Sequence, residues 1–384
     1  MTDRKLPTSL IHLPGKPRRR TVNPPIERAS TVLFDTEEAL YGPKPTYGRL
    51  GLQVHRELEE ALCLVEGADF AQLAPSGLTA CAMAIASIVR SGDHILISDS
   101  LYGPTRRFCE RRLANMGVTS TRFAPRASGE IDGLVQDNTT AILLEVPGSL
   151  TFEVSDTPAI VKLAKERRLN TVLDNTWGAG VHHRPLDLGV DISVQALTKY
   201  PVGHADAFGG VVLTSNKGLA ARINATAEDW GLSLGPEDAY TALRGLRTLP
   251  TRLKAHERAG LTVSEWLQGH DKVHEVLNPA LPSHPDYEIW QRDFSGSNGL
   301  FGVVLKPCSK ASVDAMIGSL SLFRLGFSWG GFESLLIPCD EQLTRLDTDW
   351  TSQMPGPLLR LHIGLEDTDD LISELDQAFA HLSE

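Results

Sequence analysis

The chain has 384 residues, with 37 Lys and Arg against 48 Asp and Glu, which gives a formal net charge of −11. Nucleic acids and anionic membranes usually require a basic face of clustered Lys and Arg, so this charge argues against both as partners. An apolar content of 41% with 22% charged residues is typical of a globular protein rather than a disordered one.

The five cysteines are widely spaced and form no C-x-x-C pair. Such an odd set indicates neither a disulfide framework nor a structural zinc site, and it favours a reduced, cytoplasmic location. The N-terminal stretch lacks the apolar run of a signal peptide, and no segment approaches the roughly 20 continuous apolar residues that span a membrane. We therefore expect a soluble intracellular protein.

The first fifty residues are rich in Pro, Gly, Arg and Thr and show no sustained periodicity. This composition predicts an extended arm rather than a packed element over residues 1–50. From Leu52 to Glu66 the apolar residues recur at helical spacing, and Gly67 supplies a stop. We expect a helix there, at the start of a domain that spans residues 51–245.

Short aliphatic runs alternate with helical patterns between residues 70 and 215. The predicted strands are Phe70–Leu73, His94–Asp99, Ala141–Val146, Thr171–Asp174, Ile192–Gln195 and Gly210–Thr214. The predicted helices between them are Ala80–Val89, Pro104–Met116 and Thr157–Arg168. Strands that are apolar on both faces and separated by helices indicate an α/β domain, with a mainly parallel sheet covered on both sides.

The pattern after Pro236 is long and helical. Strands are then predicted at Leu300–Leu305, Leu322–Phe327 and Leu358–Ile363, before a last amphipathic helix from Asp367 to Leu382. These elements predict a smaller α+β domain over residues 246–384.

An aspartate and a lysine each stand at or just beyond the carboxyl end of a predicted strand: Asp174 in VLDNTW and Lys199 in QALTKYP. Ligands bind at that edge of an open α/β sheet. A lysine there can form a Schiff base, and an aspartate one strand away can pair with a protonated pyridine nitrogen, as in enzymes that use pyridoxal phosphate (PLP). The alternative, which is commoner for any single pair, is that Asp174 caps a turn and Lys199 is a solvated charge.

The segment Pro75–Thr79 lies between a predicted strand and a predicted helix. Gly77 lets the backbone approach a ligand closely, the hydroxyls of Ser76 and Thr79 can donate, and a helix start offers unpaired N–H groups, so a phosphate fits here. Taken alone, this S-G-x-T motif is more often a plain helix cap. Its weight comes from its combination with the lysine and the aspartate.

Four further residues have side chains suited to a flat, anionic ligand. Tyr102 follows a predicted strand, where its ring could stack on a cofactor or simply close a turn. Arg49, beside Tyr47 in the arm, carries a forked guanidinium suited to phosphate, although a solvated Arg is equally consistent. Arg360 lies inside an apolar strand, and a buried Arg requires an anion such as a substrate carboxylate.

Other motifs carry less information. The adjacent His182 and His183 are expected at the surface without a chemical role, since no Cys or carboxylate at suitable spacing completes a metal site. The sequence has no G-x-S-x-G, H-E-x-x-H or P-loop motif that would favour a hydrolase, a metalloprotease or a nucleotide-binding protein.

Several ordered segments together resemble the trans-sulfuration enzymes, the PLP-dependent family of cystathionine lyases and synthases. The match runs from about residue 45 to about residue 380, and the segments are PTYGRLG, SGLTA, DSLYGPT, VLDNTW, QALTKYPVGHAD, RGLRTLPTRL, FSWGGFESL and RLHIGLED. With the Trp in FSWGGFES, the chain most resembles the β-lyase branch of this family, because γ-lyases and synthases usually have S-L-G-G in the matching segment. The resemblance implies the aspartate aminotransferase-like fold of PLP enzymes (fold type I).

The resemblance also implies roles for residues at the cofactor. Lys199 is expected to hold PLP and then to shuttle protons, and Asp174 to keep the pyridine nitrogen protonated. Tyr102 is expected to stack on the ring. Phosphate contacts are expected from Gly77, Leu78 and Thr198, and from Tyr47 and Arg49 of a neighbouring subunit.

On the substrate side, the resemblance implies that Arg360, with Ser328 and Trp329, holds the carboxylate, and that Tyr47 also contacts the substrate. A site shared between subunits requires at least a dimer, and the family usually forms a homotetramer that is a dimer of dimers. No metal is implied.

The reaction implied by the β-lyase resemblance is β-elimination. It cleaves the Cβ–S bond of L-cystathionine to homocysteine, pyruvate and ammonia, a step of methionine biosynthesis. Either Lys199 or Tyr102 could protonate the leaving sulfur. Alternatives are a cysteine or cystine desulfhydrase, a γ-lyase or γ-synthase of the same family, and a PLP-binding regulator without enzymatic activity.

Overall fold

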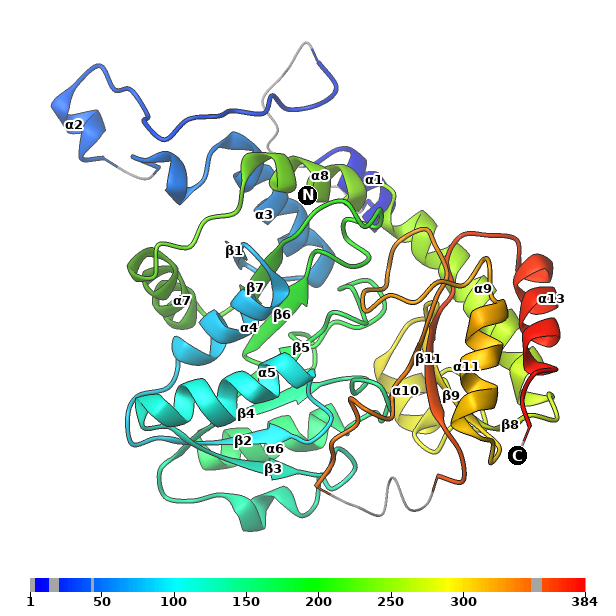
Figure 1. The fold of residues 1–384 in the computed structure, drawn as a ribbon. Coiled ribbons are helices and arrows are strands. Elements are labelled where there is room, and N and C mark those ends of the chain that lie inside the picture. The colour runs from blue at the N-terminus through cyan, green and yellow to red at the C-terminus, as the bar shows by residue number, and fades with distance from the viewer. Residues whose placement is uncertain (1–3, 14–20, 43–44, 347–353, 384) are drawn as a thin grey trace.

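The computed structural model describes residues 4–13, 21–42, 45–346 and 354–383. Two sheets carry the fold, one in each half of the body (Figure 1). Within the described residues, no helix is both long and apolar enough to cross a membrane.

The large sheet has seven strands in the order β1-β7-β6-β5-β4-β2-β3. Strand β7 is antiparallel to both neighbours, and the other pairs are parallel, which confirms the mainly parallel sheet. The strands are β1 (Phe70–Ala74), β2 (His94–Ser98), β3 (Thr119–Phe123), β4 (Thr139–Glu145), β5 (Asn170–Asp174), β6 (Ile192–Ala196) and β7 (Gly210–Thr214).

Helices cover both faces of this sheet because successive side chains along the strands point to opposite faces. Ile95 and Ile97 of β2 belong to the core beneath α4, whereas Leu96 belongs to the core on the other face. The helices of this half are α3 (Gln53–Glu66), α4 (Gly77–Ala86), α5 (Gly103–Arg107), α6 (Thr157–Arg167), α7 (Lys217–Asp229) and α8 (Pro236–Leu246).

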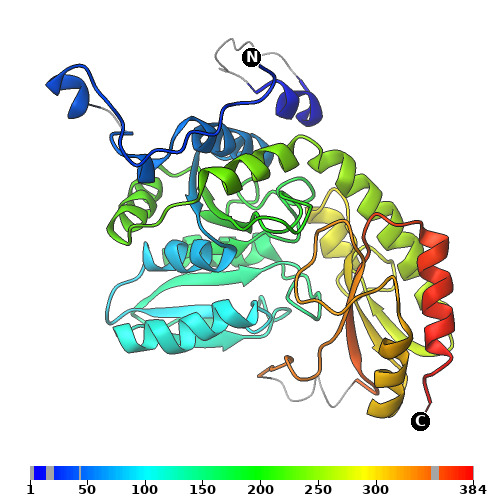
Figure 2. The ribbon, with the colours of Figure 1, turned by 45° about the horizontal axis from the view of Figure 1, so that its top comes forward.

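The small sheet has four antiparallel strands in the order β10-β11-β9-β8. The long helix α9 (Leu249–Gln268) runs from the large-sheet half to the small sheet (Figure 2). Helices α11 (Lys310–Ser319) and α13 (Thr368–Phe379) lie beside the small sheet. The remaining elements are α10 (Tyr287–Asp293), β8 (Val273–Leu277), β9 (Leu300–Leu305), β10 (Leu335–Pro338) and β11 (Leu358–His362). The domain limits at residues 50 and 245 stay predictions.

The predicted strand at Leu322–Phe327 is wrong. The backbone N–H groups of Ser321, Leu322 and Phe323 donate to the carboxylate of Glu374 on α13 rather than to a neighbouring strand. Strand β10 pairs with β11 in that place. Downstream, the Ser334 N–H and hydroxyl both donate to Glu366. Glu374 and Glu366, near the end of the chain, therefore hold the segment 321–334 at its start and at its end.

Two other expectations also need correction. Within the first fifty residues, α1 (Leu6–Ile11) is packed rather than extended, since its apolar Leu10 is buried against α3. Helix Pro104–Met116 is split into α5, a π-helical stretch at Phe108–Leu113 and a short 3₁₀ turn. Such a π-helical stretch interrupts the regular hydrogen-bond ladder, which apolar periodicity does not reveal.

Residues 21–42, which include the short helix α2 (Glu37–Leu40), extend away from the body (Figures 1 and 2). Val22 and Leu33 of this segment are each 90% exposed, and Tyr41 is 81% exposed. Large apolar side chains that are exposed together on one segment are typical of an interaction surface.

Candidate functional site

The carboxyl ends of β4, β5 and β6 meet at one edge of the large sheet. Glu145 is in register with Asp174, and Asp174 with Val194. Lys199 follows the end of β6 by three residues. The sheet therefore brings the predicted aspartate and lysine to the same edge.

Asp174 is held by hydrogen bonds to both carboxylate oxygens. The Thr176 N–H and hydroxyl donate to Oδ1 at 3.0 and 2.5 Å, and the Cys81 thiol donates to Oδ2 at 3.5 Å. Burial raises the pKa of Asp174, while these hydrogen bonds and the nearby Lys199 oppose that shift. An oriented carboxylate in such a place can bind a cationic N–H group.

Lys199 has an amine that gives up its proton more easily than a solvated lysine does. Burial and the neighbouring charge of Arg360 lower the pKa of Lys199 to about 8. Its Nζ donates to the Ser328 hydroxyl at 3.0 Å and lies 5.2 Å from the centre of the Trp329 ring. A lysine with such a pKa can act as a nucleophile or as a base near neutral pH.

Arg360 comes from the small sheet, in the middle of β11, where it is opposite Ile337 on one neighbour and Gly302 on the other. Its guanidinium donates to the carbonyls of Phe327 and Ser328 at 2.7 and 3.2 Å. Burial lowers its pKa. A desolvated guanidinium that retains free N–H groups suits a carboxylate.

The start of α4 packs against the carboxyl end of β6. A Cβ added at Gly77 would lie 2.4 Å from the Cβ of Ala196, so only glycine permits this approach. Ser76 caps the helix by accepting from the Thr79 N–H at 3.1 Å, and Leu78 is exposed. The Thr198 hydroxyl exchanges hydrogen bonds with the Gly209 backbone. A helix start with free N–H groups fits an anion such as a phosphate.

Tyr102 lies just before α5 with its side chain 48% exposed. Its backbone N–H donates to Glu145 Oε2 at 2.5 Å. Burial and the nearby Glu145 raise the pKa of the Tyr102 phenol, while Arg360 opposes the shift. The exposed ring is therefore available to stack on a flat ligand.

Three polar residues at the site were not predicted from the sequence: Glu145, Thr176 and Cys81. Burial and the adjacent Asp174 raise the pKa of Glu145 to about 8, and Ser149 donates to its other oxygen at 2.5 Å. The sequence signal for Glu145 was an acidic residue that ends an apolar strand, as in VLD. Cys81 and Thr176 reach Asp174 only through the packing of α4 and of the turn after β5.

Tyr47 and Arg49 are not brought to Lys199 within one chain. The Arg49 guanidinium donates to the Glu228 carbonyl at 3.4 Å, at the end of α7. Tyr47 forms an isolated bridge with Thr31 and is exposed. In the described part of the chain, neither has a hydrogen bond to the residues around Lys199.

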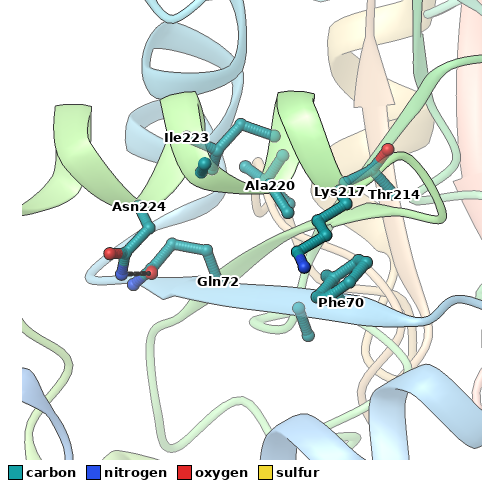
Figure 3. A pocket seen from close by; sticks show the side chains of 10 residues that line it. Phe70, Gln72, Thr214, Lys217, Ala220, Ile223 and Asn224 are labelled. Atoms are coloured by element: carbon teal, nitrogen blue, oxygen red, sulfur yellow. Dashed lines mark hydrogen bonds between the residues drawn. The ribbon is translucent and has the colours of Figure 1, made fainter. Parts of the chain in front are cut away.

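A hollow of about 340 Å³ lies elsewhere, between the edge strand β1 and helix α7 (Figure 3). Lys217 and Phe70 face each other across it, and Asn224 donates to Gln72 at 3.1 Å. It shares no residue with the predicted site, so the site is defined by the side chains at the sheet edge rather than by this hollow.

Comparisons with known proteins identify the family to which the chain belongs. The sequence profile of the family described as Cys/Met metabolism PLP-dependent enzyme matches residues 7–380. A cystathionine beta-lyase of Salmonella typhimurium is 40% identical, over 100% of both chains. An L-alanine/L-glutamate racemase of Wolbachia pipientis is 37% identical, over 94% of this chain and 93% of the relative. The crystal structure of metB from Corynebacterium glutamicum superposes with a TM-score of 0.90 at 28% identity, covering 98% of each chain.

Proposed function

Because the chain belongs to the Cys/Met metabolism PLP-dependent enzyme family, we propose that it cleaves the Cβ–S bond of L-cystathionine. The proposed products are homocysteine, pyruvate and ammonia. Support comes from full-length relatives named cystathionine beta-lyase, among them that of Salmonella typhimurium. The observation that carries the proposal is the contact of Lys199 with Ser328 and Trp329, where the β-lyase-like motif meets the amine.

The residues at the sheet edge fit PLP. Lys199 offers an amine with a lowered pKa for the covalent link, and Asp174 offers an oriented carboxylate for the ring nitrogen. Gly77, Leu78 and Thr198 stand where a phosphate would accept N–H and hydroxyl hydrogen bonds. Tyr102 has an exposed ring that can stack on the pyridine. PLP, when bound, supplies an electron-withdrawing ring that makes the Cα proton of the substrate acidic.

Lys199 has the central role in proton transfer under this proposal. As a free amine it would remove the proton from Cα of the bound substrate. With a pKa of about 8, roughly a tenth of the amine is neutral at pH 7 and about half at pH 8, which supplies the base. Asp174 holds the proton on the ring nitrogen through its negative charge.

The leaving group departs when the Cβ–S bond breaks and sulfur takes the bonding electron pair. Sulfur then gains a proton from Lys199 or from Tyr102, and homocysteine leaves as its thiol. Water hydrolyses the remaining three-carbon unit to pyruvate and ammonia. Arg360, with Ser328, Trp329 and Tyr47, is proposed to hold the substrate and keep its Cα–H bond facing Lys199.

Product analysis tests the reaction. Purified protein loaded with PLP should convert L-cystathionine to pyruvate and homocysteine in equal amounts. Formation of 2-oxobutyrate and cysteine would instead show γ-elimination. Comparing kcat/KM for cystathionine, cystine and cysteine ranks the desulfhydrase alternatives, and chiral analysis of alanine and glutamate tests the activity named for the Wolbachia pipientis relative.

The variant Lys199→Ala separates an enzyme from a PLP-binding regulator. It should lose the visible absorbance band of the bound cofactor, and its turnover should fall roughly 10⁴-fold or more. The control is Lys217→Ala on α7, which should retain both. A Lys199→Ala protein with the turnover of the parent would contradict every PLP-dependent assignment made here.

We also propose a homotetramer, a dimer of dimers, in which Tyr47 and Arg49 complete the site of a neighbouring subunit. This arrangement is supported by the exposed apolar side chains of residues 21–42 and by the contacts that Arg49 and Tyr47 make within their own chain, with Glu228 and Thr31 rather than with the residues around Lys199. Mixing the inactive variants Lys199→Ala and Arg49→Ala, with exchange of subunits, should restore activity, because some mixed sites combine an intact Lys199 with an intact Arg49. Mixed oligomers without restored activity would contradict a shared site.

A cytoplasmic location is proposed as well. All five cysteines are described by the structure and are free of disulfides, which suits a reducing compartment. Fractionation of cells that express the native chain, with antibody detection, would test it.

A further inference from the structure

The loop Phe327–Gly331, between the two sheets, packs directly on the backbone of Lys199. Gly330 has φ +82°, and a Cβ added there would lie 2.7 Å from the nitrogen of Tyr200 and 3.1 Å from the Cα of Lys199. The same loop carries the Ser328 hydroxyl and the Trp329 ring that contact Nζ. The position of this loop therefore sets the surroundings of the amine.

Strand β11 holds this loop through two side chains, Arg360 and His362. Arg360 donates to the carbonyls of Phe327 and Ser328. His362 Nε2 lies 3.1 Å from the Gly330 nitrogen and 3.1 Å from the Gly331 oxygen. Because the two residues are two apart in a strand, they point to the same face, so β11 holds the loop at both of its ends.

His362 is fully buried, and it reaches the lysine region through aromatic contacts as well. Tyr200 lies with its ring centre 6.0 Å from that of His362 and 5.5 Å from that of Trp329. Burial lowers the pKa of His362 to about 3, so the ring is uncharged near neutral pH. A neutral imidazole Nε2 either accepts from the Gly330 N–H or donates to the Gly331 carbonyl, and each tautomer ties the ring to the loop.

We propose that His362 is a positioning residue that fixes the Phe327–Gly331 loop and, through it, places the Ser328 hydroxyl and the Trp329 ring beside Lys199. Its action is indirect, through this loop and through the Tyr200 ring, which packs against both His362 and Trp329. Its effect on substrate use rests on the proposed function, whereas its effect on the lysine does not.

The test compares His362→Leu, which removes the polar ring atoms, with His362→Gln, whose amide can reach the place of Nε2. Both are studied as PLP-loaded protein. His362→Leu should lower kcat/KM for L-cystathionine about tenfold, the loss expected for one buried hydrogen bond, with a rise in KM. It should also shift the pH midpoint of the visible absorbance of the bound cofactor. His362→Gln should restore most of both values.

A shift of the pH midpoint of the absorbance in His362→Leu can be assigned to the loop, because this substitution leaves the charged groups around Lys199 unchanged. These groups are Asp174 and Arg360, with Tyr102 and Glu145 beside them, while the buried His256 packs against His362. Burial lowers the pKa of His256 to about 4, so it too is uncharged near neutral pH.

A double-mutant cycle tests the route through the loop. If His362 acts by placing Trp329, the effects of His362→Leu and Trp329→Phe should be far from additive. The control is His94→Gln, a buried histidine at the other edge of the large sheet, bonded to Thr139 and Thr121. It should change stability without moving the midpoint or KM.

Three outcomes would overturn the inference: an unchanged midpoint and KM in His362→Leu, no recovery in His362→Gln, or additive effects with Trp329→Phe. If His362→Leu fails to fold, His362→Asn, whose shorter amide does not reach the place of Nε2, replaces it in the comparison with His362→Gln and in the cycle against Trp329→Phe. If the parent protein does not cleave cystathionine, the proposed function fails, and the absorbance midpoint alone still tests the role of His362.

Discussion

The two sheets contribute to the site in different ways. In the large sheet, Asp174 and Lys199 stand at or beyond the carboxyl ends of parallel strands. In the small sheet, Arg360 lies in the middle of β11, and its position is set by the face of the strand to which it points. The large sheet therefore gathers several functional groups along its carboxyl edge, whereas the small sheet presents one side chain, Arg360, from the middle of a strand.

This difference follows from strand direction. Parallel strands all end at the same edge, together with the starts of the helices that follow them, so an amine, a carboxylate and a helix N-terminus converge there. Antiparallel strands end alternately at both edges and create no such convergence. The large sheet is therefore suited to the cofactor, and Arg360 of the small sheet to the substrate. Substitutions of Asp174 and Arg360 should have separable effects, whereas substitution of His362, which holds the loop beside Lys199, should affect both sides.

The largest separable effect is expected from Asp174→Asn on the large sheet. Loss of the negative charge should lower kcat roughly 10³-fold and alter the absorbance spectrum of the bound PLP, because the ring nitrogen loses its anionic partner. Steady-state kinetics and a spectrum of the holoenzyme measure both. The matched control is Asp191→Asn, at the opposite end of β6, where the carboxylate accepts from Thr171.

Arg360→Lys on the small sheet should act on the substrate instead. Lysine keeps the charge but loses the fork that binds a carboxylate, so KM should rise roughly 10²-fold while the cofactor spectrum stays unchanged. The control, Arg292→Lys on α10, concerns a partly exposed arginine paired with Asp293 and Asp156, and should leave KM as it is. A spectrum altered by Arg360→Lys would break the division between the sheets.

Gly330→Ala tests how tightly the loop between the two sheets fits. Its positive φ and the 2.7 Å approach to Tyr200 predict a loss of about 1–3 kcal/mol in the free energy of unfolding. Gly318→Ala near the end of α11, where an added Cβ meets no atom within 4 Å, should be neutral or stabilising by up to about 1 kcal/mol. Urea midpoints of both variants measure the contrast.

The last prediction concerns acid stability in the large-sheet half. His182 and His183 were expected at the surface, but both are buried. His183 stacks on Phe294 with ring centres 4.2 Å apart, and its Nδ1–H donates to Asn175 Oδ1 at 3.0 Å. Burial lowers its pKa to about 3. Between roughly pH 6.5 and 3 the unfolded chain therefore binds a proton that the folded chain does not, and stability falls as the pH falls.

Replacing His183 should remove this difference in proton binding between the unfolded and the folded chain. His183→Phe keeps the stacking on Phe294 and should reduce the slope of unfolding free energy against pH by up to about 1.4 kcal/mol per pH unit below pH 6. Urea titrations at several pH values give the slope. An identical slope in variant and parent would show that His183 titrates normally in the fold.

Aliphatic strands and their order along the chain could be predicted well from the sequence. Leu300–Leu305 and Gly210–Thr214 were predicted with the bounds observed, because both are buried on two faces. Strand β3, with the sequence TSTRF, was missed because it lies at the sheet edge and is partly exposed, so its side chains are polar. Leu322–Phe327 was mistaken for a strand because its apolar pattern does not reveal Glu374. This carboxylate, far along the chain, accepts the backbone hydrogen bonds at the start of the segment.

The site shows the same limit. The places of Lys199, Asp174 and the segment Pro75–Thr79 could be predicted because each stands where a predicted strand ends or a helix begins. Glu145 and Cys81 act through neighbours that are distant in sequence, and the bond between His362 and the loop depends on how β11 packs against it. Local patterns carry no information on such contacts.

Glu366 and Glu374 have a consequence for how the protein is made. Both lie near the end of the chain, and they hold the stretch that leads into and out of the Phe327–Gly331 loop. Every strand of the large sheet precedes both glutamates in the chain, so this sheet can be complete before the loop beside Lys199 has its anchors. The order of this loop therefore depends on the docking of α13.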